Sequence, residues 1–339
     1  MNRALLRYVA RRVAFLLPQL FIVSIIAFAL LKLTPGDPAR LALGPAATNE
    51  VSVQAMRERL GLDDPVVVQY VKYITNVVQA DWGRSFRTQE PILEDIGRRL
   101  PATLELITLA TLISLLLGAS IGIVAGLRPR GILNRFLTWY GFFAGSIPDF
   151  WMGLLLIFFF FHLAGIAPAP LGQISISTAA PPEKTYLVPI DALIAGNWAA
   201  FESAITHLVL PTLTLVLVYM PAVLKTVSAA VEKYRSEPFL VAARVHGMRR
   251  RYVYWYLFRN TLPPTITIVG VLFVFLIGGT VLVEKVFAWN GFGQYAVEAV
   301  LRKDLLAVQG FLLVAAAFTM LTYLIVDILY AVADPRVRL

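Results

Sequence analysis

Few side chains in this sequence have the type and spacing that catalysis would need. The 339-residue chain has no cysteine, and its three histidines, at positions 162, 207 and 246, lack the spacing of metal ligands. A nucleotide-binding loop of the form Gly-x-x-x-x-Gly-Lys-Ser/Thr is also missing, because the Lys-Thr pairs at 184–185 and 225–226 lack the preceding glycines. We therefore expect no metal site and no ATP hydrolysis in this chain, and the candidate residues are groups that bind a partner or a solute.

One polar-apolar stretch fits such a binding role, and it runs from Ser236 to Gly247 with the sequence Ser-Glu-Pro-Phe-Leu-Val-Ala-Ala-Arg-Val-His-Gly. Ser236 is a suitable N-cap, Glu237 complements the helix dipole, and Pro238 is tolerated in a first turn. Gly247 can end the helix in a left-handed conformation. The stretch predicts a helix of roughly three turns that lies outside the membrane.

Two binding modes suit this helix. Phe239, Leu240 and Ala243 are expected to project apolar surface, and the small residues Ala242 and Gly247 would let a partner's backbone approach, which suits a helix seated in the groove of another protein. The alternative is an interfacial helix that lies on lipid, which the three arginines at 249–251 would favour. The residues alone do not separate the two.

A second candidate is a carboxylate inside an apolar block. Asp149 follows Pro148 at roughly 20 Å from the inner end of its block, where a charge should face a cavity, a partner or a protein interface. Pro148 also removes a backbone donor, so a local break in the helix is expected. Asp149 either makes a buried structural hydrogen bond or lines a translocation path.

Three further residues lie near the outer end of the fifth apolar block. Gly278 and Gly279 would allow close helix contact or flexing at an outer gate. Glu284 closes that block, and Asp327 closes the sixth; we interpret both as boundary or packing residues in preference to solute ligands. Glu284 is nevertheless kept with Pro148, Asp149, Gly278 and Gly279 as a candidate for the translocation path or gate.

The elements that must position these residues are membrane spans. Hydrophobic residues make up 58% of the chain and charged residues only 15%, and the apolar residues form long blocks. The first block, Val13–Leu31, would reach roughly 29 Å as a helix, enough to cross the hydrocarbon core. Five more spans are expected at about 104–127, 136–165, 203–225, 262–283 and 305–330. Only helices satisfy the backbone at such lengths in lipid, so the predicted class is an all-α integral membrane protein with about six spanning helices.

Basic residues give the orientation and explain the net charge of +9. Lys and Arg gather at 3–12, 128–135, 225–259 and 336–338, which fall on one side of a six-helix protein. By the positive-inside rule that side, with both termini, is cytoplasmic. No nucleic-acid-binding motif accompanies the charge, so we do not expect nucleic acid as a partner.

The chain divides into three parts. Residues 1–35 form the N-terminal tail and first span, residues 36–102 an external helical subdomain, and residues 103–339 a core membrane domain with a long inner loop at 226–261. Within the subdomain, 48–50 can cap a helix that Gly61 stops, and helices are also expected at 65–78 and 91–100. The outer segment 166–202 is rich in Pro, Ser and Ala, and we expect it to be irregular.

The inner loop resembles the EAA loop of ABC importer permeases, in which Glu-Ala-Ala, three residues and Gly precede a later Leu-Pro. The matching residues are Ala242, Ala243, Gly247 and Leu262-Pro263. Val241 stands at the Glu position, and the spacing to Leu-Pro is longer. Both departures are similar to the peptide/nickel branch of the family, whose usual residues correspond here to Ala243-Arg244, Gly247 and Phe258-Arg259-Asn260.

The resemblance to this branch covers almost the whole chain. The other similar segments are 35–38 (Pro-Gly-Asp-Pro), 60–63 (Leu-Gly-Leu-Asp), 81–85 (Asp-Trp-Gly-Arg-Ser), 99–105 (Arg-Leu-Pro-Ala-Thr-Leu-Glu), 278–284, 287–293 and 327–336. Their order and spacing make the resemblance specific, and the outer segment 166–202 is the least similar part.

The resemblance implies the type I ABC importer arrangement. A second, homologous permease subunit would complete the path, two ABC ATPase subunits would bind ATP and Mg, and an extracytoplasmic solute-binding protein would deliver the cargo. This chain itself would hold no cofactor. Its inner helix would be the coupling helix that fits an ATPase cleft, with the contacting residues Glu237, Phe239, Leu240, Ala242, Ala243, Arg244 and Gly247.

The expected function is thus the import of short peptides by alternating access, in the cytoplasmic membrane of a bacterium or archaeon. The same assembly could instead carry nickel chelates or another small solute, because selectivity lies mainly in the separate binding protein. A secondary transporter would need buried charge networks or paired discontinuous helices, and only Asp149 fits it.

Overall fold

The computed structural model describes residues 3–33, 36–43, 47 and 49–333, and every named element in these ranges is a helix. Five helices are long and apolar enough to cross a membrane, and a bent helix pair can serve as a sixth span. The five long helices are α1 (Arg3–Leu33), α5 (Ile92–Leu127), α9 (Trp198–Arg235), α11 (Arg250–Gly279) and α14 (Leu305–Ala333). These confirm the predicted all-helical membrane fold with about six spans. Of the segment 327–336, which resembles the peptide/nickel branch, residues 334–336 lie outside the described residues.

The third predicted span is not one straight helix. It consists of α6 (Ile132–Ser146) and α7 (Asp149–Leu156), which continues as the π-helical segment η2 (Ile157–Leu163). The two parts meet at an angle of 104°. Pro148 is the N-cap residue of α7, so the predicted break at this proline is confirmed.

The long helices extend beyond the apolar blocks that predicted them. α5 begins at Ile92, so the helix expected at 91–100 is the first part of the spanning helix, which continues through Pro101. α9 continues to Arg235, and α11 begins at Arg250. These two helices therefore contain most of the inner loop expected at 226–261. Hydropathy marks the part of a helix that suits lipid, whereas backbone hydrogen bonds set where the helix ends.

α5 and α9 pack closely along a row of small residues in α5. Gly118, Gly122 and Gly126 face α9, and a Cβ at Gly122 would lie 2.8 Å from the carbonyl oxygen of Leu224. At Gly126 the corresponding distance to the carbonyl oxygen of Ser228 is 2.6 Å. No side chain fits there, so these glycines let the two backbones approach and hold α5 and α9 together.

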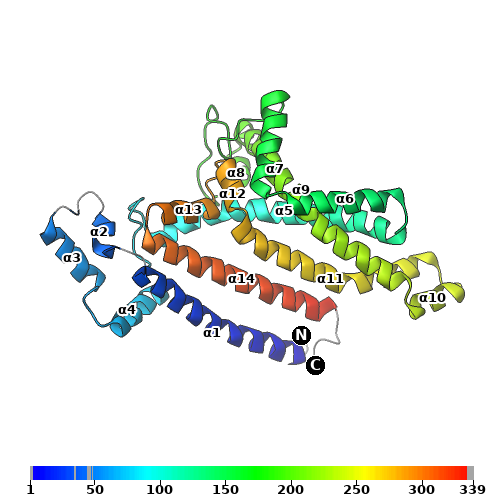
Figure 1. Cartoon of the computed structure of the whole chain (residues 1–339), viewed down its shortest axis with the longest axis horizontal. Coiled ribbons are helices and arrows are strands. Elements are labelled where there is room, and N and C mark those ends of the chain that lie inside the picture. Colours follow the sequence, from blue (N-terminus) through cyan, green and yellow to red (C-terminus); the bar gives the residue numbers. More distant parts are fainter. Residues whose placement is uncertain (1–2, 34–35, 44–46, 48, 334–339) are drawn as a thin grey trace.

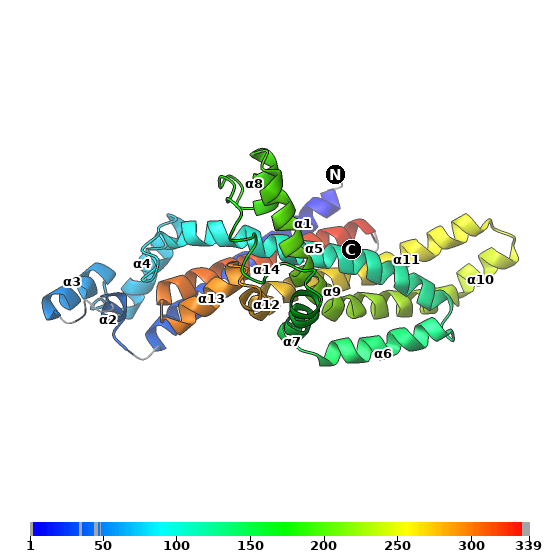
Figure 2. The ribbon, with the colours of Figure 1, turned by 90° about the horizontal axis from the view of Figure 1, so that it is seen from above.

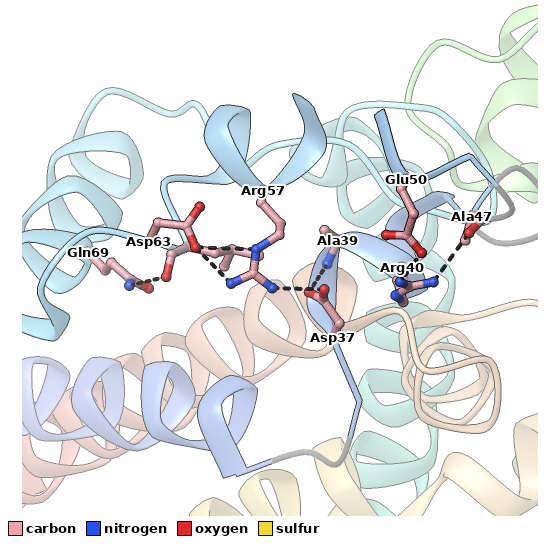
Figure 3. A network of polar contacts seen from close by, with 9 residues as sticks. Asp37, Ala39, Arg40, Ala47, Glu50, Arg57, Asp63 and Gln69 are labelled. Carbon is pink, nitrogen blue, oxygen red and sulfur yellow. Dashed lines mark hydrogen bonds and ion pairs between the residues drawn. The ribbon is translucent and has the colours of Figure 1, made fainter. Parts of the chain in front are cut away.

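The segment between α1 and α5 contains three short helices, α2 (Pro38–Leu43), α3 (Glu50–Leu60) and α4 (Val66–Val78), at one end of the molecule (Figure 1). The predicted helix limits of α3 are confirmed: the Asn49 side chain accepts a hydrogen bond from the amide of Val51, and Gly61 is left-handed at φ +63°. The Arg57 guanidinium donates to Asp37 at 2.9 Å and to Asp63 at 2.7 Å, which ties α2, α3 and the following turn together (Figure 3).

The outer segment 166–202 contains more structure than its composition predicted. It holds the short helix α8 (Val188–Ile194), and α9 already begins at Trp198. Asp191 accepts hydrogen bonds from the backbone of Lys184, Thr185 and Tyr186 and from the Thr185 hydroxyl. Burial alone would raise the pKa of Asp191, but these hydrogen bonds outweigh it and hold that pKa below its usual value.

α10 (Pro238–Val245) lies at the end of the molecule opposite α3, beyond the other helices (Figures 1 and 2). The starting end of α1 and the final end of α14 both point toward the end that carries α10 (Figure 1). Two more short helices, α12 (Val281–Val286) and α13 (Phe292–Leu301), connect α11 to α14. The core thus places the predicted binding helix at one extremity and Asp149 at the α6–α7 break.

Candidate functional site

α10 is carried between the projecting ends of α9 and α11 (Figure 2). It begins after Glu237, which is its N-cap residue but makes no side-chain capping hydrogen bond. The prediction that Ser236 caps this helix is wrong, because Ser236 ends α9 and its hydroxyl donates back to the carbonyl oxygen of Glu232. A serine at a helix C-terminus can bond to the preceding turn, which removes it from the next helix.

The predicted stop at Gly247 is confirmed. Gly247 has φ +71°, in the left-handed region that favours glycine. Its amide donates to the carbonyl oxygen of Arg244, and the next amide, of Met248, donates to that of Ala243. These bonds satisfy the last carbonyl groups of the helix and turn the chain sharply toward α11.

The side chains of α10 divide into one that holds the helix and several that face outward. Leu240 is fully buried and belongs to the same core cluster as Val253 and Leu257, so the expectation that it projects outward is wrong. Phe239 is 45% exposed and Val245 is 78% exposed. Among the other predicted contact residues, Ala242, Arg244 and Gly247 are exposed. Glu237 and Ala243 are half-buried. The structure thus presents an apolar helix end that the described residues leave uncovered.

Asp149 lies at the break between α6 and α7 and is half-buried. Its Oδ2 accepts a hydrogen bond of 2.8 Å from the hydroxyl of Tyr219 on α9, and its Oδ1 accepts one of 2.7 Å from the amide of Phe150. The Tyr219 ring packs edge-on against Phe275 of α11, with ring centroids 5.7 Å apart. The carboxylate therefore joins the α6–α7 break to α9, and the Tyr219 ring extends this contact to α11. Pro148 beside it is exposed.

Tyr219 is a site residue that the sequence analysis missed. It stands alone in an apolar block with no motif around it, so only the polar partner in another span reveals its role. Gly279 belongs to the same group, because a Cβ on Gly279 would lie 3.5 Å from the Tyr219 hydroxyl. A Cβ on Gly278 would have no atom within 4 Å, so Gly278 does not contact this group.

Glu284 lies in a separate place and is fully buried. It accepts hydrogen bonds from the Thr103 hydroxyl at 2.6 Å and from the amide of Gln294 at 2.8 Å. At Gly291 a Cβ would lie 2.7 Å from the Glu284 carboxylate, so only glycine fits over it. These contacts match the packing interpretation of Glu284: it joins α12, α5 and the start of α13, and it is closed to a solute in this conformation.

No metal site is formed by the described residues, because no three His, Cys, Asp or Glu side chains gather there. The described residues thus offer two candidate sites, the exposed face of α10 and the hydrogen-bonded group around Asp149.

Comparison with known families matches most of the chain. Residues 118–339 match the family described as binding-protein-dependent transport system inner membrane component, and residues 5–107 match the N-terminal family of the same membrane components.

Three curated relatives are similar along nearly their full length. The probable D,D-dipeptide transport system permease protein DdpB of Escherichia coli K12 is 37% identical over 93% of this chain and 92% of its own. The di/tripeptide transport system permease protein DppB of Pseudomonas aeruginosa is 32% identical, with 98% and 99% covered. The dipeptide transport system permease protein DppB of Alkalihalophilus pseudofirmus is also 32% identical, with 98% and 100% covered.

The match to the family model covers well over half of the residues, and it includes α10, Asp149, the whole of α9 and the last part of α5, which carries Gly118, Gly122 and Gly126. The chain therefore belongs to the family of binding-protein-dependent transport system inner membrane components.

Proposed function

We propose that this chain is the permease subunit of an ATP-driven importer that carries short peptides across the cytoplasmic membrane by alternating access. The observation that carries the proposal is α10, an exposed apolar helix end held away from the membrane spans by the ends of α9 and α11. A helix in that position suits a groove in a partner protein. The curated relatives named for dipeptide and tripeptide transport favour peptides over nickel chelates as the cargo.

The partners in this proposal are two ATPase subunits that bind ATP and Mg, a second permease subunit, and an external solute-binding protein. The end of the molecule with α10 and both terminal helix ends is cytoplasmic, and α2–α4 are external. The basic residues support this orientation, because the turn at 128–131 and the segment 249–251 contribute five arginines at that end.

The path in this proposal passes the α6–α7 break. Asp149 and Pro148 lie at this break, and the Tyr219 hydroxyl joins Asp149 to α9. A carboxylate that is hydrogen-bonded between two spans can respond when those spans move relative to each other. Gly279 lets the Tyr219 hydroxyl approach α11, and exposed Gly278 leaves space beside it.

The test is a substitution that changes the exposed face of α10 and keeps the helix. Ala242 is exposed in the middle of α10, and arginine there retains high helix propensity while adding bulk and charge. We expect Ala242→Arg to insert normally in the membrane and to lose co-purification with the ATPase subunits.

The matched control is Ala55→Arg, at an exposed alanine in α3 on the other side of the molecule. It should retain the ATPases at the wild-type level. Normal ATPase recovery with Ala242→Arg, at equal amounts of permease, would refute the docking role of α10.

A further inference from the structure

A cavity of about 540 Å³ lies between the turn that joins α5 to α6 and the last turn of α9. Its lining residues are Arg128, Pro129, Arg130, Gly131, Glu232 and Arg235, which we call the arginine pocket. Neither the exposed face of α10 nor the Asp149 group contributes to it.

The arginine pocket has an excess of positive charge. Three arginines line it against one carboxylate, Glu232, and no ion pair among the described residues joins Glu232 to any of them. Arg128 and Arg130 are exposed, and their guanidinium groups make no hydrogen bond with the described residues. Free guanidinium groups that share one cavity favour an anionic ligand.

Arg235 supplies a second, independent indication. Its Nη1 donates to the carbonyl oxygen of Leu127 at 2.9 Å, which fixes the side chain against the end of α5. Its Nε is buried and has no hydrogen-bond partner among the described residues. A buried donor without an acceptor is costly, so a ligand with acceptor oxygens would stabilise this arrangement.

The backbone beside the pocket has the same preference. Gly131 is the N-cap residue of α6, so the unpaired amides of the first turn of α6 begin next to the pocket. The start of a helix favours an anion through these amides and the helix dipole. Guanidinium groups, a buried free donor and a helix start together select an acceptor-rich anion, and a phosphate group has that chemistry.

The surface next to the pocket is apolar. Ile132, in the first turn of α6, is 90% exposed, and Phe136 one turn later is 66% exposed. An arginine cluster that borders an exposed apolar helix face is typical of the level where lipid headgroups meet the hydrocarbon. A lipid whose acyl chains lay along α6 would therefore have its phosphate within reach of the arginines.

We propose that the arginine pocket binds a phosphate group, carried either by a phospholipid headgroup or by a soluble phosphate compound. The bound phosphate joins the α5–α6 turn to the last turn of α9. Arg244 of α10 donates to the carbonyl oxygen of Arg235 at 3.2 Å, so the bridge also restrains α10. That consequence for coupling rests on the proposed function, whereas phosphate binding itself does not.

The experiment measures ligand binding by the purified full-length chain in detergent, through the shift of its thermal unfolding midpoint. The probes are phosphatidylglycerol, diacylglycerol with the same acyl chains, and inorganic phosphate at millimolar concentration. The test variant is Arg128→Gln with Arg130→Gln, because neither side chain has a partner whose loss would unfold the protein. The control variant removes equal charge outside the pocket, as Arg249→Gln with Arg250→Gln.

We expect phosphatidylglycerol, and not diacylglycerol, to raise the midpoint of the wild type and of the control variant. The pocket variant should need about a hundredfold more phosphatidylglycerol, since each charge-assisted hydrogen bond from a guanidinium to the phosphate contributes about a factor of ten. A rise with inorganic phosphate that the pocket variant loses would support the site and assign it to a soluble phosphate compound.

Two results would overturn the proposal. One is a wild-type midpoint that responds to neither phosphatidylglycerol nor inorganic phosphate. The other is an equal response of the pocket and control variants, which would mean that general surface charge attracts the probe. Because the assay needs neither ATPase nor cargo, its outcome is independent of the α10 docking test.

Discussion

Replacement of Gly122 with alanine tests the close packing of α5 on α9, the helix that leads to α10. A Cβ at this position would lie 2.8 Å from the carbonyl oxygen of Leu224 and 3.1 Å from the Cβ of Val227. The carbonyl belongs to the α9 backbone and cannot rotate away as a side chain would. The two helices must therefore separate by several tenths of an ångström, which disturbs the packing along their length.

The expected cost follows from two opposing effects. Overpacking a close helix contact costs about 1–3 kcal/mol. Alanine in a helix interior is favoured over glycine by about 1 kcal/mol, which offsets part of that cost. We expect a net loss of up to about 2 kcal/mol, equivalent to a change of up to about 30-fold in the ratio of folded to unfolded protein.

The assay is thermal unfolding of the purified chain in one detergent, with Gly97→Ala as the control. Gly97 lies in the same helix and is exposed, and nothing lies within 4 Å of the Cβ position there. The control should match or exceed the wild-type midpoint, while Gly122→Ala should fall below it. Equal midpoints for the two variants would refute the packing argument.

Three further outcomes are expected. Glu284→Ala should lower the stability of the chain by about 2–4 kcal/mol in the same thermal assay, because it leaves the buried Thr103 hydroxyl and the half-buried Gln294 amide without their acceptor. An unchanged midpoint would contradict this. Asp149→Leu should lower peptide uptake by about tenfold at unchanged assembly with the ATPases, since the Tyr219 hydroxyl loses a charged acceptor, and unchanged uptake would leave Asp149 a structural role. The lowered pKa of Asp191 stabilises the outer loop above the ordinary carboxyl pKa of about 4, and this stabilisation is lost as the pH falls toward the folded pKa. Proteolysis of the loop in the wild type should thus increase only below about pH 4, whereas in Asp191→Asn it should already be faster at neutral pH. Equal cleavage of the two proteins at neutral pH would disprove this role of Asp191.

Much of the architecture could be predicted from the sequence because lipid imposes strong constraints. Charge-free blocks of about twenty residues indicate spans, and Pro148 indicated the break before Asp149. Gly247 was predictable as the end of α10 because few other residues adopt its left-handed backbone. These features depend on local chemistry, which a single sequence contains.

The remaining features depend on contacts between distant segments. Leu240 and Phe239 are adjacent apolar residues, and only the packing of α10 on its neighbours decides that the first is buried and the second exposed. Tyr219 becomes a site residue through Asp149, 70 positions away. The free donor of Arg235 is likewise visible only once α5 and α9 lie side by side.

The most direct test of the proposed function is peptide uptake by proteoliposomes that contain the assembly purified from its native host through this chain. The account predicts that ATPases and a second permease co-purify, and that uptake of a labelled dipeptide requires ATP and the solute-binding protein. Uptake by this chain alone, at the same rate without ATP, would contradict it.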